Sequence, residues 1–253
     1  IDHSVVAQGE AAIRARIAQL KAEGVRMAVV DAVSNADLLR LGPALKGMPL
    51  VTAGSGVAIG LPGNFGVAPC NEAARLPAAQ GLQAIVSGSC SVATNQQVMD
   101  FIKAGKPALA IDPLRIAAGV DVAAEALAWA EGHIGQGPVL VYSTAEPSAV
   151  RAIQGKLGSE KAGAMVEETI AAIARGLVQR GVRQLIVAGG ETSGACVQAL
   201  GITQMRIGAQ IDPGVPWCHA VAPDAKDGLH ITLKSGNFGG TDFFTKAFAQ
   251  LQA

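Results

Sequence analysis

The chain has 253 residues, of which half are hydrophobic and 16% are charged, and its formal net charge is zero. This length is enough for one large domain or two modest ones with a real core. The neutral balance excludes the broad basic field that attracts nucleic acid or an anionic membrane surface, so we expect a small-molecule partner held by local groups. With 31 glycines and only 4% aromatic residues, the composition favours an α/β enzyme over a β-sandwich.

The four cysteines show no short zinc-site or redox spacing, and we expect free thiols in a reducing cytoplasm. Cys90 and Cys196 lie in glycine-rich turns, but neither has a histidine nearby in the sequence, which favours packing over a nucleophilic role. No apolar run is long enough to span a bilayer, and no signal peptide is evident. The chain begins at Ile1 without methionine and reaches a helical pattern by Ala11, so we expect it to be part of a longer protein.

In residues 1–66, helix and strand patterns alternate. The expected elements are a helix over 10–23, a buried strand over 26–33, a helix capped by Ser34 and running to Lys46, and a short strand over 50–53. This order predicts βαβ units of a parallel sheet. Residues 67–81 lose all periodicity and contain two prolines, which predicts a linker.

Residues 82–253 again alternate strands and helices, which predicts a second α/β domain with a mainly parallel sheet. The expected strands cover 82–86, 107–111, 139–142, 184–188, 205–207, 215–219 and 229–234. The expected helices cover 94–104, 122–133, 161–180, a segment ending at Leu200, and 242–250.

Three strand ends of this second domain are rich in glycine and hydroxyl groups: Ser87-Gly88-Ser89, Gly189 to Gly194, and Gly236 to Gly239. Ligands of open α/β sheets lie beyond the carboxyl ends of the strands, and a helix that starts there offers backbone N–H groups to phosphate. Each loop alone is also explained as an ordinary turn or helix cap. Three such loops on one predicted sheet favour a ligand site.

Individual side chains in these loops suggest roles. Thr192 or Ser193 is expected to cap the helix that follows. Glu191 would repel a bare phosphate, so it is better suited to a ribose hydroxyl or, through water, to a magnesium ion. Lys234 offers a charge to phosphate, although a strand lysine more often faces solvent. No Walker A sequence and no G-x-G-x-x-G after a strand is present, which weakens the P-loop and dinucleotide-binding interpretations.

Other candidates for chemistry are weak. The four histidines show no metal-ligand spacing, so no metal site on the protein is expected. Asp31 and Asp112 lie near strand ends, where catalytic carboxylates occur, but a turn-capping role is favoured for both. The sequence assigns no catalytic residue.

Several long segments resemble one family. The stretches VSGSCS, VAGGETSGACVQALGI with the following QIDPGVPW, and LKSGNFGGTDFF resemble the nucleotide-binding domain of the four-carbon acid sugar kinases, long known only as a domain of unknown function. Upstream, DAVSNADLL and TAGSGVAIGLPGNFG resemble the second half of the same family's substrate domain. The amino-acid sequences of several segments are most similar to those of the 3-oxo-tetronate kinase branch.

The resemblance implies two α/β domains with mainly parallel sheets, the N-terminal one incomplete. Residues 1–66 would be the C-terminal part of the sugar-acid domain, 67–81 the linker and 82–253 the nucleotide-binding domain. The implied nucleotide contacts are Ser87, Gly88, Ser89, Gly189, Gly190, Glu191, Thr192, Ser193, Gly194, Gly236, Asn237 and Gly239. The family's acidic D-D-F-T-G opening is absent from this sequence, so these residues alone are expected to bind nucleotide but to have little kinase activity.

The leading hypothesis is therefore an ATP- and Mg²⁺-dependent cytoplasmic kinase that phosphorylates 3-oxo-tetronate or a related threonate or erythronate. A homodimer is a possible assembly of this kinase. A nicotinamide-dependent oxidoreductase is the enzymatic alternative, and titration with NAD(H) against ADP separates the two. A non-catalytic nucleotide- or phosphosugar-binding module is the third possibility, which an ADP-release assay on the full-length protein would decide.

Overall fold

The structure is a computed structural model that describes residues 1–143 and 159–251. The chain divides into two compact units, Ile1–Asn71 and Glu72–Ala253, which we describe separately. Within the described residues, no helix has both the length and the apolar character needed to cross a membrane.

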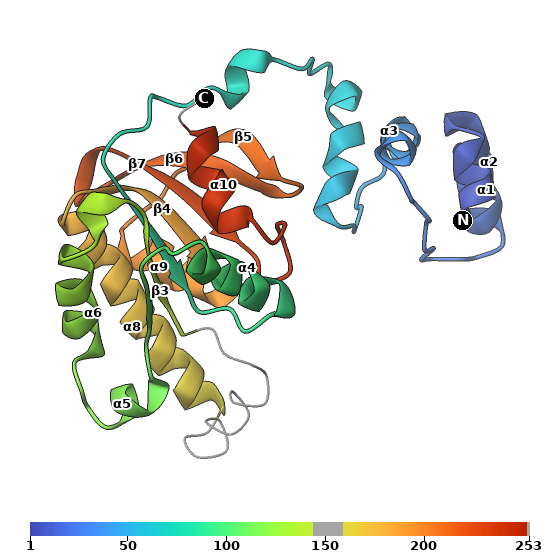
Figure 1. The fold of residues 1–253 in the computed structure, drawn as a ribbon. Helices are drawn as coiled ribbons and strands as arrows, with labels where there is room; N and C mark the ends of the chain where they lie inside the picture. Colours follow the sequence, from blue (N-terminus) through green and yellow to red (C-terminus); the bar gives the residue numbers. More distant parts are fainter. Residues whose placement is uncertain (144–158, 252–253) are drawn as a thin grey trace. The chain divides into compact units, whose positions relative to one another are not determined.

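The first unit is helical (Figure 1). Its elements are α1 (His3–Ala7), α2 (Glu10–Ala22), α3 (Asn35–Ala44) and the short 3-10 turns η1 (Ser55–Gly60) and η2 (Pro62–Phe65). Ser34 caps α3 as expected, because its hydroxyl accepts the N–H of Asp37 while the Asp37 carboxylate accepts the N–H of Ser34. A Cβ on Gly42 would lie 1.9 Å from the carbonyl oxygen of Gly60, so α3 can pack on η1 only with glycine there.

The strands expected over 26–33 and 50–53 are wrong, because the backbone of residues 1–71 forms no strand. Met27 and Val29 are 91% and 84% exposed instead of buried. A strand needs a neighbour that satisfies its backbone groups, and here only Ile1 provides one. Its amino group donates to the carbonyl of Val29, and its carbonyl accepts the N–H of Asp31, which is the bonding pattern of a single parallel bridge.

The second unit contains one seven-stranded sheet, which confirms the α/β fold class with a mainly parallel sheet. Its strands are β1 (Leu82–Ser87), β2 (Ala108–Ala110), β3 (Val139–Tyr142), β4 (Val182–Ala188), β5 (Arg206–Asp212), β6 (Val215–Ala222) and β7 (Ala225–Lys234). They lie in the order β2-β3-β1-β4-β7-β6-β5. The pairs from β2 to β7 are parallel, whereas β6 pairs antiparallel with both β7 and β5.

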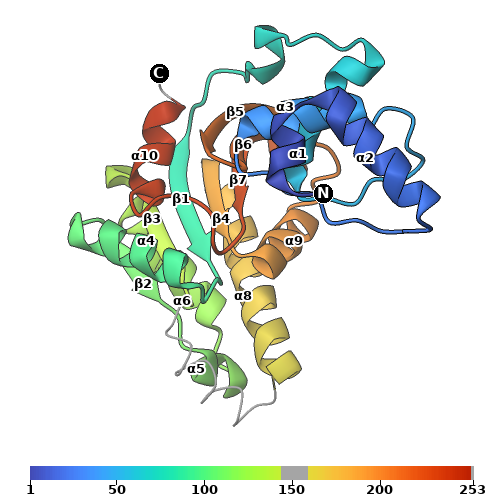
Figure 2. The ribbon, with the colours of Figure 1, turned by 90° about the vertical axis from the view of Figure 1, so that its right-hand side faces the viewer.

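Helices cover both faces of this sheet (Figures 1 and 2). They are α4 (Val92–Lys103), α5 (Pro113–Ala117), α6 (Val122–Glu131), α8 (Ser159–Gln179), α9 (Gly190–Ala199) and α10 (Phe243–Gln250), with the 3-10 turns η3 (Asn71–Ala74) and η4 (Ile134–Gln136). Side chains of the central strands alternate between two cores. Val86 and Val187 belong to the core beneath α6, α8 and α9, whereas Ile85 and Ile186 belong to the core beneath α4 and α10. The central strands are therefore apolar on both faces.

The segment that precedes β1 packs on the second unit. The guanidinium of Arg206 donates to the carbonyl of Glu72, and Nε2 of His230 lies 3.0 Å from the carbonyl oxygen of Pro77. Leu76 packs against the core beneath α10. The boundary between the two units thus falls inside the stretch 67–81, and its later part is held against β5 and β7.

Candidate functional site

Three loops meet at one edge of the sheet. The strands β1, β4 and β7 are adjacent and parallel, so their carboxyl ends lie side by side. The loops that follow them begin at Gly88, Gly189 and Ser235. The expected site residues lie in these loops, except Ser87, which ends β1, and Gly190 to Gly194, which form the first residues of α9. The expectation that the three loops share one sheet is confirmed, and their contact with a ligand stays a prediction.

The first two loops interlock through small residues. The N–H groups of Gly88 and Ser89 both donate to the carbonyl of Ala188, at 3.0 and 3.3 Å. A Cβ on Gly88 would lie 2.3 Å from the buried hydroxyl of Thr192, and one on Gly189 would lie 2.6 Å from it. Gly189 also has a φ of +129°, which side chains rarely adopt. Both glycines are therefore required by packing.

The helix α9 begins in the second loop without a side-chain cap. Gly189 is its N-cap residue, so the expectation that Thr192 or Ser193 caps it is wrong. Both lie one turn inside α9, where the Ser193 hydroxyl donates back to the carbonyl of Gly189 at 2.6 Å. Within the described residues, the N–H groups of Gly190, Glu191 and Thr192 have no acceptor. An uncapped helix N-terminus with free N–H groups suits an anion.

Glu191 is exposed near the start of α9, and its carboxylate interacts with that of Glu167 on α8. Burial, followed by the hydrogen bond and the charge of Glu191, raises the pKa of Glu167 above its ordinary value. Two facing carboxylates are stabilised by a shared proton or by a cation. Sequence reasoning missed Glu167, because nothing in a helix sequence shows which turn packs against a neighbouring loop. The described residues contain no larger group of acidic, histidine or cysteine side chains suited to a metal.

Lys234, the last residue of β7, is completely buried, so it neither faces solvent nor is free for a phosphate. Its ammonium donates to the hydroxyl of Thr94 at 2.9 Å and to the carbonyls of Ser235, Gly236 and Phe238 at 3.1–3.3 Å. Burial lowers the pKa of Lys234 to about 8, which still leaves most of the side chain charged at neutral pH. Its cation is used to hold the third loop.

The helix α4, which follows the first loop, holds the third loop from the other side. The hydroxyls of Ser91 and Thr94 donate to the carbonyl of Gly236. The amide nitrogen of Gln97 lies 3.0–3.1 Å from the carbonyl oxygens of Phe238, Gly239 and Gly240. The amide oxygen of Gln97 is buried and has no hydrogen-bond partner among the described residues.

The end of the third loop and its connection to β4 are also fixed. The N–H of Gly240 donates to Asp212 at 2.8 Å, and Asp212 pairs with Lys246 of α10 at 2.7 Å. The N–H of Gly189 donates to the carbonyl of Lys234 at 2.8 Å. The three loops thus form one hydrogen-bonded unit built from the ends of β1, β4 and β7.

The remaining candidates have structural roles. Asp112 caps α5 by accepting the N–H of Leu114 at 2.8 Å, as favoured from the sequence. Cys196 is buried in the core beneath α9, and burial raises the pKa of its thiol to about 12, so it is no nucleophile. His219 and His230 stack edge to face on β6 and β7, and burial lowers the pKa of His230.

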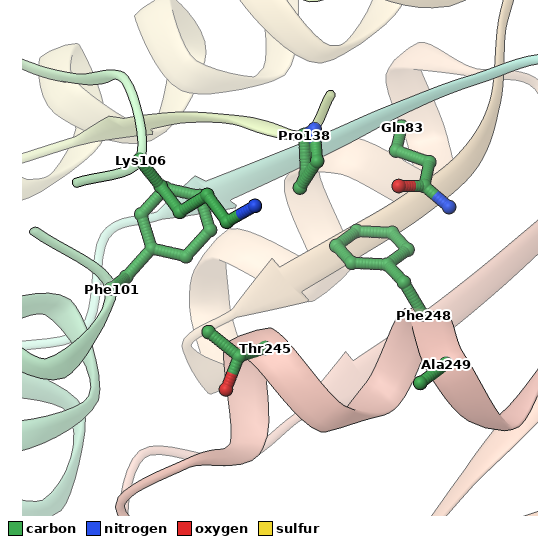
Figure 3. A pocket seen from close by; sticks show the side chains of 7 residues that line it. All are labelled: Gln83, Phe101, Lys106, Pro138, Thr245, Phe248 and Ala249. Carbon is green, nitrogen blue, oxygen red and sulfur yellow. The ribbon is translucent and has the colours of Figure 1, made fainter. Parts of the chain in front are cut away.

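A small cavity of about 190 Å³ lies at the opposite edge of the sheet (Figure 3). Figure 3 shows Thr245 and Phe248 of α10 facing Lys106 and Pro138. Lys106 lies two residues before β2 and Pro138 directly before β3, so the cavity lies at the amino ends of the strands. None of its lining residues belongs to the three loops.

Glycine turns, an uncapped helix and unpaired N–H groups lie at the carboxyl edge of the parallel sheet, which is where α/β domains of the phosphate-binding class hold their ligands. Comparison with known protein families agrees with this interpretation of the second unit. Residues 84–244 match the model described as a nucleotide-binding C-terminal domain, and residues 1–61 match that of a sugar-binding N-terminal domain. The chain belongs to the four-carbon acid sugar kinase family.

Individual relatives agree with this assignment. A 3-oxo-tetronate kinase of Cupriavidus necator is 53% identical over 98% of this chain and 57% of its own length. That of Pseudomonas fluorescens is 51% identical over 97% of this chain and 57% of its own length. A solved Haemophilus influenzae protein of the same domain-of-unknown-function family is 36% identical, with a TM-score of 0.73, over 99% of this chain and 60% of its own. The chain thus spans just over half the length of these relatives.

Proposed function

We propose that this chain carries the nucleotide-binding domain of a kinase that transfers the γ-phosphoryl group of ATP to a hydroxyl of a four-carbon sugar acid. Residues 82–253 form this domain, 67–81 the linker, and 1–66 part of the sugar-acid domain. The single observation that supports it best is the set of unpaired N–H groups on the second and third of three interlocked loops at one sheet edge. We propose 3-oxo-tetronate or a related threonate or erythronate as the substrate, and the names of the relatives support the first of these.

In this proposal the loops bind and orient the phosphates. The N–H groups at the start of α9 hold one phosphate, and those of the third loop hold another. The sugar-acid hydroxyl oxygen forms the new bond to the γ-phosphorus, the bond from that phosphorus to the ADP oxygen breaks, and the hydroxyl proton passes to a general base. Glu191 would help to hold a magnesium ion, and that ion would supply charge neutralisation of the phosphates. The carboxylates of Glu191 and Glu167 are oxygen donors of the kind that this ion prefers.

The test is calorimetric titration of the 253-residue chain with ADP and Mg²⁺, and separately with NAD(H). We expect binding of ADP and none of NAD(H), because the dinucleotide sequence G-x-G-x-x-G is absent. A coupled ADP-release assay with sugar acid should show little turnover by this chain and turnover by a full-length protein. NAD(H) binding without ADP binding would refute the proposal, and ADP binding without turnover by the full-length protein would leave a non-catalytic module. Homodimer formation is tested by light scattering.

Glu191→Ala is expected to weaken ADP binding in the presence of Mg²⁺ about tenfold, because a charged hydrogen bond to ribose or to metal-bound water is lost. Without Mg²⁺, binding no weaker than that of the parent would assign Glu191 to metal-bound water, whereas the same tenfold loss would assign it to the ribose hydroxyl. Glu168→Ala is the matched control, because Glu168 is exposed on α8. If Glu191→Ala binds Mg-ADP like the parent, Glu191 does not belong to the site.

A further inference from the structure

The starting observation is a buried cation without a counter-charge. Lys234 has no exposed surface, and among the described residues no carboxylate pairs with its ammonium. Burying an unpaired ammonium is costly unless several oxygens replace its water shell. Here the Thr94 hydroxyl and three carbonyls of the loop 235–238 do so. The loop is therefore wrapped around the charge.

Neutral donors of α4 act in the same direction. Ser91, Thr94 and Gln97 all donate to carbonyls of residues 236–240, from the side of the first loop. Together with Lys234 they bind the carbonyls of Gly236, Phe238, Gly239 and Gly240, which are all the carbonyls of residues 236–240 except that of Asn237. Most backbone carbonyls of the third loop therefore already accept hydrogen bonds from side chains of the protein.

Two N–H groups of the loop are paired, that of Phe238 with the carbonyl of Ser235 and that of Gly240 with Asp212, but three others are not. The N–H groups of Gly236, Asn237 and Gly239 have no acceptor within the described part of the chain. Asn237 is exposed, so these groups lie on a stretch that solvent reaches. A turn whose carbonyls are engaged and whose neighbouring N–H groups, here those of Gly236 and Asn237, are unpaired can form a backbone concavity for an anion. The nearby buried charge adds a favourable potential for that anion.

We propose that Lys234 is a positioning residue: by holding the carbonyls of loop 235–240 it presents the loop's N–H groups to the phosphates of the nucleotide. The inference rests on the proposed nucleotide function and assigns this loop to the phosphates, not to the adenosine. Lys234 itself makes no contact with the ligand, because its donors are spent on Thr94 and the loop.

The test compares Lys234→Met and Thr94→Val with Lys226→Met, a control that removes an exposed lysine from the same strand. Each 253-residue variant is titrated with Mg-ADP, inorganic pyrophosphate and adenosine, and its Tm is measured. Lys234→Met should weaken the binding of ADP and of pyrophosphate about tenfold or more and leave the affinity for adenosine unchanged. Its Tm should not fall, because methionine fills the volume without a charge to desolvate. Thr94→Val should shift the affinities in the same direction, and Lys226→Met should shift none.

The outcomes separate this inference from the proposed function. If the parent chain binds neither ADP nor pyrophosphate, the proposed function fails, and the inference with it. If the parent binds ADP and Lys234→Met binds it equally well, only the inference is overturned. It is also overturned if Lys234→Met loses affinity for adenosine and for pyrophosphate to the same extent and has a lower Tm. That is the behaviour of a residue needed only for folding.

Discussion

Gly236→Val is expected to abolish nucleotide binding, with a loss of at least about 100-fold in affinity, roughly 2.7 kcal/mol. Gly236 does not have a positive φ, so the reason lies in packing. A Cβ there would lie 2.7 Å from the Ser89 hydroxyl and 3.1 Å from Ser91. A branched side chain must push the third loop away from the first, which displaces the unpaired N–H groups of the third loop from those of the second.

The measurement for Gly236→Val is calorimetric titration with Mg-ADP beside a thermal melt. The loop is at the edge of the sheet, so the melt should change little. Gly135→Val is the matched control, because a Cβ at Gly135 meets nothing within 4 Å and this glycine lies in η4, outside the three loops. A Gly236→Val protein that melts normally and binds ADP like the parent would show that the third loop does not touch nucleotide.

Gly88→Ala is expected to lower the free energy of unfolding by about 2 kcal/mol and to weaken ADP binding, because it overfills the contact between the first two loops. The new methyl group would lie 2.3 Å from the Thr192 hydroxyl and 3.2 Å from Ile170. Thr192→Ala removes that hydroxyl. In the double variant the two changes should therefore cost less than their sum, as measured by urea unfolding.

Gly135→Ala again serves as the control, and it should leave both quantities unchanged. Strict additivity of Gly88→Ala and Thr192→Ala would contradict the contact between the two loops. A Gly88→Ala protein as stable as the parent would contradict it as well.

The positions of the central strands were predictable because hydrophobic runs ending in glycine are a strong local signal. The expected strands over 82–86, 184–188 and 229–234 overlap β1, β4 and β7, which end within one residue of the expected positions. Their placement on one sheet edge followed from the rule for parallel strands. The strand expected over 26–33 failed because burial and pairing depend on partners that a local pattern does not specify.

The side-chain contacts within the site were not predictable in the same way. The burial of Lys234 has one sequence signal, namely its place at the end of a strand that turns out to be central and covered on both faces. The contacts of Gln97 with the third loop join residues more than 140 positions apart. The proximity of Glu167 to Glu191 likewise depends on how α8 packs on α9. Tertiary packing, which local periodicity does not encode, determines all three.

The central claim is that the three loops bind nucleotide. It is tested most directly by following the backbone amide resonances of the 253-residue chain by NMR during titration with Mg-ADP. We predict the largest shifts at the unpaired amides of the second and third loops, Gly190, Glu191, Thr192, Gly236, Asn237 and Gly239. Shifts confined to the cavity at the opposite sheet edge, around Phe101, Lys106 and Phe248, would contradict the account.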